Sequence, residues 1–76
     1  VYMPKLYSYR EIVNALKRLG FSTISQRGSH IKMRGIIDGK LQTAIIPAHK
    51  QVALGTLSSI LKQANITKHD LEANAR

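Results

Sequence analysis

The sequence contains no cysteine, which excludes disulfide bonds and thiolate metal sites and is typical of a protein from a reducing compartment. It also lacks any apolar run approaching the ~18–20 residues of a membrane span, and no signal peptide is visible. These absences predict a soluble, cytoplasmic protein with no membrane partner. Val1 and Tyr2 precede Met3, and we expect Met3 to be the natural start.

Acidic residues are scarce, with four Asp and Glu against 12 Lys and Arg, which gives a formal net charge of +8. Such an excess favours a nucleic acid or an acidic protein as partner. A membrane surface is less favoured, because the basic residues are spread along the chain and the expected helices lack exposed aromatic residues. The acidic residues are Glu11, Asp38, Asp70 and Glu72. Each fits a helix cap or a turn, which argues against a metal nuclease built on carboxylates.

Three histidines, His30, His49 and His69, are not clustered, and with no cysteine they form no convincing metal signature. We therefore expect neither a metal nor another cofactor. A chain of 76 residues has room for one domain, covering residues 1–76. A chain of this length buries only about 60% of its unfolded surface, so we expect a thin core without a deep enclosed cleft.

The first helix begins at Ser8, where Ser8 and Glu11 have the spacing of a capping box. Gly20 provides a left-handed stop for this helix. Apolar residues recur at helical spacing along one stripe: Ile12, Val13, Leu16 and Leu19.

Three strands are predicted next, over residues 21–26, 30–36 and 41–46. Ile24 is the clear core candidate of the first strand. Gly28 turns the chain into the second strand, and Asp38-Gly39 is a strong hairpin signal before the third. Tight turns between consecutive strands predict a three-stranded antiparallel meander.

A second helix is expected over residues 54–64, where Gly55 suggests a close approach of two backbone segments. Residues 67–70 start a short terminal helix, which we expect to fray after Leu71. The element order α-β-β-β-α predicts an α+β fold, a two-layer sandwich with both helices on one face of the sheet.

The second strand carries the main site candidate. Because successive side chains point to opposite faces, Ile31 and Met33 belong to the core, and His30, Lys32 and Arg34 to the open face. An imidazole suits proton transfer near neutral pH, and neighbouring cations gather phosphates. RNA supplies its own 2′-hydroxyl nucleophile, so such a site needs no metal to cleave it, whereas DNA should stay intact. In an arbitrary protein, His30 would be an ordinary surface histidine.

Further residues are expected to contact RNA. The first helix presents cations opposite its apolar stripe. His49, in the loop after the third strand, is a second acid or base, a phosphate contact, or merely solvated. His69 is expected to be solvated. Tyr7 and Tyr9 either stack on bases or pack against the edge of the sheet. The expected RNA contacts are Arg10, Lys17, Arg18, Arg27, Gly28, Ser29, Lys32, Arg34, His49 and Lys50.

Three segments together resemble the HicA family of toxins: Gly28-Ser29-His30, Pro47-Ala48-His49, and Gly55-Thr56-Leu57 with the following residues 60–64. The similarity extends over roughly residues 7–70. It implies a double-stranded-RNA-binding-domain-like fold and a small ribonuclease that cleaves mRNA, with His30 as the catalytic residue. It also implies a HicB-type antitoxin as partner, bound over that histidine. The apolar hairpin arm at residues 36–41 departs from the family pattern.

Two other functions remain open from the residues. A non-catalytic module that binds double-stranded RNA would have the same fold and charge. A basic face could also serve chiefly to dock an acidic protein. Only the nuclease predicts turnover of RNA.

Overall fold

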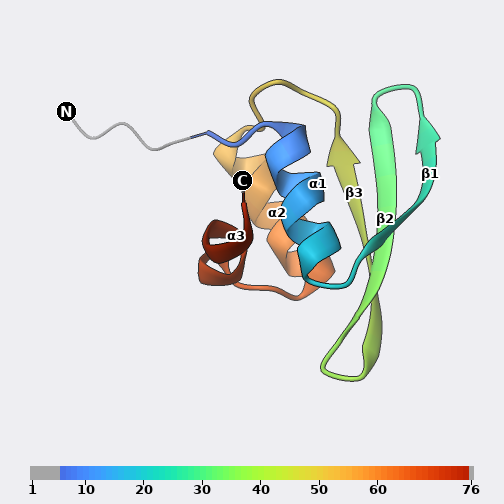
Figure 1. Ribbon diagram of the computed structural model, residues 1–76. Coiled ribbons are helices and arrows are strands. Elements are labelled where there is room, and N and C mark those ends of the chain that lie inside the picture. Colours follow the sequence, from blue (N-terminus) through green and yellow to red (C-terminus); the bar gives the residue numbers. More distant parts are fainter. Residues whose placement is uncertain (1–5, 76) are drawn as a thin grey trace.

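The computed structural model describes residues 6–75, so the expectation for Val1, Tyr2 and Met3 lies outside it. The elements are α1 (Tyr9–Arg18), β1 (Ser22–Arg27), β2 (His30–Ile37), β3 (Lys40–Pro47), α2 (Leu54–Ala64) and α3 (Lys68–Asn74) (Figure 1). The predicted α-β-β-β-α order is confirmed, with α3 added at the end. The fold is α+β and fits the double-stranded-RNA-binding-domain-like description.

Local signals define α1. The Glu11 amide donates to the Ser8 hydroxyl over 3.2 Å, and the Ser8 amide donates to the Glu11 carboxylate over 3.0 Å. These two bonds form the predicted capping box. At the other end Gly20 has a φ of 102°, and the Phe21 amide donates to the Leu16 carbonyl over 2.9 Å. This is the Schellman arrangement, which ends the helix and turns the chain toward β1.

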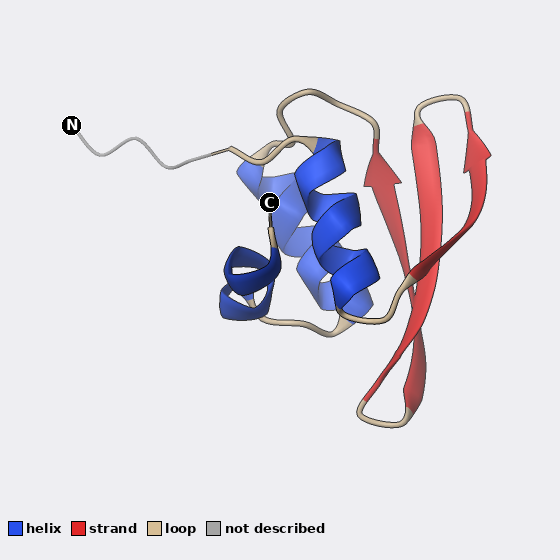
Figure 2. Ribbon diagram, viewed as in Figure 1, coloured by secondary structure: helices blue, strands red, loops and turns tan. Residues whose placement is uncertain are grey.

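The sheet has the strand order β1-β2-β3, and both strand pairs are antiparallel. Across β2 and β3, Ile31 pairs with Ile46 and Met33 with Ala44. All four side chains are at most 6% exposed. Within residues 6–75, the helices lie together on one side of the sheet and leave the other side bare (Figure 2). We call this uncovered side the bare face.

α3 extends the helical layer by packing on α1. The expected fraying after Leu71 is wrong, because the helix continues to Asn74 and the Ala75 amide still donates to the Leu71 carbonyl over 2.8 Å. Leu71 is fully buried, so the last turns are held by tertiary packing. A second capping box, between Thr67 and Asp70, fixes the start of α3.

The prediction that Ile24 belongs to the core is wrong, since its side chain is 46% exposed. The pairing of β1 with β2 shifts register between Thr23 and Ser25, so Ile24 lies in a bulge. β1 is also an edge strand, and all six of its residues are exposed. Phe21, just before the strand, is the residue that reaches the core at 3% exposure.

The close approach expected at Gly55 occurs elsewhere. A Cβ atom added at Gly55 would meet nothing within 4 Å, whereas one at Gly35 would lie 2.8 Å from the Phe21 ring. Gly35 therefore leaves the space that Phe21 fills. Tyr7 is 7% exposed and belongs to the core, so its ring is not free to stack on a base.

Candidate nucleic-acid interface

The alternation predicted for β2 is confirmed. Ile31 and Met33 are buried under the helices, whereas His30 is exposed and Lys32 and Arg34 are half-buried. Side chains on one strand alternate between faces, so these three polar residues lie on the bare face. The structure thus places the candidate histidine in the open, in a row with two cations.

A depression of about 390 Å³ surrounds His30 on the bare face. We call it the basic depression, and its lining residues are Ser25, Arg27, His30, Lys32 and Ile45. The strand register explains this grouping, because Arg27 pairs with His30, and Lys32 has Ser25 and Ile45 on either side. All three strands therefore contribute to one site, which combines an imidazole with two positive charges.

The turn before His30 is tied to the loop after β3. Gly28 has a φ of 54°, which glycine adopts without strain. The Ala48 amide donates to the Ser29 carbonyl over 2.6 Å, and His30 pairs with Pro47. Two motif segments that are distant in the sequence, residues 28–30 and 47–49, are therefore neighbours in the fold.

His49 and Lys50 are exposed in this loop, outside the lining of the basic depression. The His49 carbonyl accepts a hydrogen bond from the Tyr9 amide over 3.0 Å, so the loop also contacts the start of α1. Arg34 lies further along the bare face, where its Nε donates to the Thr43 hydroxyl over 3.0 Å. His69 is exposed on α3, as expected.

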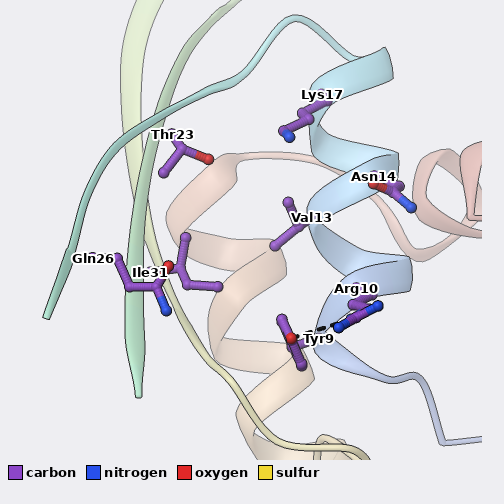
Figure 3. Close-up of a pocket in the computed structure, with 8 residues that line it drawn as sticks. All are labelled: Tyr9, Arg10, Val13, Asn14, Lys17, Thr23, Gln26 and Ile31. Atoms are coloured by element: carbon purple, nitrogen blue, oxygen red, sulfur yellow. Dashed lines mark hydrogen bonds between the residues drawn. The ribbon is translucent and has the colours of Figure 1, made fainter. Parts of the chain in front are cut away.

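The structure separates the three cations of α1. Arg18 donates from Nη1 to the Asn74 carbonyl over 2.7 Å and so faces α3. Arg10 and Lys17 instead line a second depression between α1 and β1 (Figure 3). Arg10 donates from Nε to the Tyr9 hydroxyl over 3.2 Å, and this bond raises the pKa of Arg10 above its ordinary value.

The sequence analysis did not predict the depression between α1 and β1. Thr23 and Gln26 contribute to it because they pair with Met33 and Ile31 and so point to the helix side of β1. That orientation depends on the register and on the bulge at Ile24. The polar composition of β1 could have indicated this site, since a strand that buries none of its residues has both faces available to a ligand.

Within residues 6–75, no three or more His, Cys, Asp or Glu side chains gather as a metal site would require. Across the same residues, every helix is too short or too polar to cross a membrane.

Among curated proteins, none is found to match the chain. A family model described as the HicA toxin of bacterial toxin-antitoxin matches residues 9–66. The matched region covers most of the chain, including the strands that form the basic depression and the loop that contacts the turn before His30. The chain therefore belongs to the HicA family of toxins of bacterial toxin–antitoxin systems.

Proposed function

We propose that the protein is an endoribonuclease that cleaves mRNA without a metal ion, with His30 as general acid or general base. The observation that supports this most is the position of His30. Its imidazole is exposed in a depression that also contains Arg27 and Lys32, on the side of the sheet without helices. A toxin with this activity would halt translation and growth, and its substrate places it in the cytoplasm.

The chemistry is an internal transfer within the RNA. The 2′-hydroxyl loses its proton, and its oxygen forms a bond to the adjacent phosphorus. The bond from phosphorus to the 5′-oxygen breaks, and that oxygen takes a proton. The products are a 2′,3′-cyclic phosphate and a 5′-hydroxyl. A histidine within hydrogen-bond reach moves a proton in one of the two transfers, which is typically worth about 10²–10⁴ in rate.

The two neighbouring cations suit the charge that develops in this reaction. Negative charge builds up on the phosphorane oxygens as the new bond forms. Arg27, directly across the strand pair from His30, and Lys32, two residues further along β2, can stabilise that charge. The antiparallel pairing of β1 with β2 fixes the backbone positions from which both side chains reach the depression.

We also propose that a HicB-type antitoxin binds over the bare face and covers His30. The family is one half of a toxin–antitoxin pair, and this face combines charge with exposed apolar surface. Ile36 and Leu41 pair across β2 and β3, at 65% and 64% exposure. Ile36 follows His30, Lys32 and Arg34 in the same alternation. An acidic partner with apolar contact residues would match both features.

The test is incubation of the purified chain with end-labelled RNA in EDTA. We expect cleavage to products ending in a 2′,3′-cyclic phosphate. A DNA of the same sequence should stay intact, and a single 2′-deoxy substitution at the cleaved position should abolish cutting there. Full-length RNA that persists while it is bound would favour the non-catalytic double-stranded-RNA binder. RNA that is neither bound nor cut would favour a basic face that serves only to dock a protein.

A further inference from the structure

A groove between α1 and the edge strand β1 lies on the opposite side of β1 from the basic depression. Its volume is about 390 Å³, at the lower end of the range for ligand sites. We call it the α1–β1 groove. The residues that matter for its chemistry are Tyr9, Arg10, Lys17, Thr23, Gln26 and Ile31.

The groove combines positive charge on one wall with neutral polar groups on the other. Arg10 and Lys17 are two turns apart on α1, and both line the groove, while Thr23 and Gln26 face them from β1 (Figure 3). The one hydrogen bond among the side chains drawn there joins Arg10 to Tyr9. Neither the Lys17 ammonium nor the Gln26 carboxamide bonds to another of these side chains, so both are available to a ligand in the groove.

The two sites share β1 as a common wall. Gln26 and Arg27 are consecutive, so Gln26 points into the α1–β1 groove and Arg27 into the basic depression. Among residues 6–75, β1 pairs only with β2 and so has a free edge. A flexible chain that carries phosphates can thus leave the basic depression, pass around this edge and enter the groove.

We propose that the α1–β1 groove binds a nucleotide of single-stranded RNA that flanks the phosphate cut at His30. This inference rests on the proposed nuclease function and adds the class of RNA. Arg10 and Lys17 take the backbone phosphate. The Gln26 carboxamide, which both donates and accepts hydrogen bonds, contacts the edge of the base or the ribose.

The size and position of the groove favour a single strand over a duplex. In a duplex the bases are stacked and paired, and proteins recognise its shape through the minor groove and the phosphates. An unpaired strand can turn a base out of the stack and bend around one β-strand without breaking base pairs, which a duplex cannot do. Phosphate contacts on both sides of β1 fit such a path.

The experiment measures binding of the full-length chain to a short single-stranded RNA with 2′-O-methyl groups. This probe lacks the nucleophile, so it reports binding without cleavage. Lys17→Ala should weaken binding and reduce the logarithmic salt slope by about 0.7, the value for one lost phosphate contact on a single strand. Gln26→Ala should weaken binding about fivefold, as for one lost hydrogen bond, and leave the slope unchanged. Lys68→Ala removes the same charge from α3 and serves as the matched control.

A second measurement uses cleavable RNA and separates this inference from the function on which it rests. Lys17→Ala and Gln26→Ala should raise KM and leave kcat unchanged, because they remove binding that is equal in the ground and transition states. If wild type cleaves RNA and both variants match it in affinity, KM and salt slope, the groove is not an RNA site. A duplex of the same sequence that competes as well as the single strand would also overturn the inference. A wild-type chain that neither binds nor cleaves RNA overturns the nuclease and the groove together.

Discussion

The Ala48 amide donates a 2.6 Å hydrogen bond to the carbonyl oxygen of Ser29, the residue before His30. This bond joins the turn between β1 and β2 to the loop that leaves β3. The Tyr9 amide then donates to the His49 carbonyl over 3.0 Å and ties the same loop to α1. The backbone at His30 is therefore supported from the helical layer as well as from the neighbouring strands.

The first prediction concerns this support. The amide of Ala48 should exchange its hydrogen for deuterium much more slowly than the amide of Gln51, which lies in an exposed part of the same loop. Hydrogen exchange followed by NMR measures both amides in one sample. Equal exchange rates would mean that the loop opens freely and does not hold the turn before His30.

The second prediction compares two glycines. Gly35→Ala should lower the free energy of unfolding by about 1–3 kcal/mol, because the new Cβ would lie 2.8 Å from the buried ring of Phe21. Gly55→Ala is the matched control, since a Cβ there meets nothing within 4 Å. It should be neutral or stabilise by about 0.4–1 kcal/mol. Urea unfolding of the two variants beside wild type gives both values, and a reversed order would contradict this account of the core.

The features that could be predicted from the sequence are the local ones. Ser8 and Glu11 form their capping box within one helical turn. Asp38 and Gly39 have φ values of 52° and 78°, and positive φ at both positions is what a two-residue hairpin turn of this sequence type requires. The alternation of buried and exposed side chains along β2 could likewise be predicted from two premises: side chains of a strand alternate between faces, and one face of the sheet is covered.

What could not be predicted depends on long-range packing. Ile24 is as apolar as any core residue, and its exposure follows from the bulge and from the edge position of β1. Arg18 was grouped with Lys17, its neighbour on α1, but its partner Asn74 is 56 residues away. The α1–β1 groove depends on the register of β1. Register is specified by the residues that a strand buries, and β1 buries none, so its sequence does not define the register.

The third prediction follows from Arg18. Arg18→Ala should lower the free energy of unfolding by about 1 kcal/mol, because it removes the hydrogen bond from the guanidinium to the end of α3. It should leave the salt slope of RNA binding unchanged, in contrast to Lys17→Ala. Binding titrations over a range of salt concentrations check this directly. If the salt slope of RNA binding falls equally in Arg18→Ala and Lys17→Ala, Arg18 does contact the RNA phosphates.

The fourth prediction concerns acid stability. The Thr67 amide donates to the Asp70 carboxylate over 3.0 Å, and this bond and the one with the Thr67 side chain lower the pKa of Asp70 below its ordinary value of 3.8. A carboxyl whose pKa is lower in the folded state stabilises the fold above the unfolded value. This stabilisation is lost as the pH falls through the folded value. Wild type should therefore exceed Asp70→Asn in unfolding free energy near neutral pH, with the difference shrinking below about pH 4. A difference that stays constant down to about pH 2 would contradict the shift.

The most direct test of the nuclease is the rate at which His30→Ala cleaves RNA. The variant should lose about 10²–10⁴ in cleavage rate, while its affinity for the 2′-O-methyl RNA and its unfolding free energy stay close to those of wild type. His69→Ala, which removes an exposed imidazole from α3, should cleave as wild type does. A His30→Ala protein that is folded, binds RNA and cuts it at the wild-type rate would show that this imidazole takes no part in the reaction.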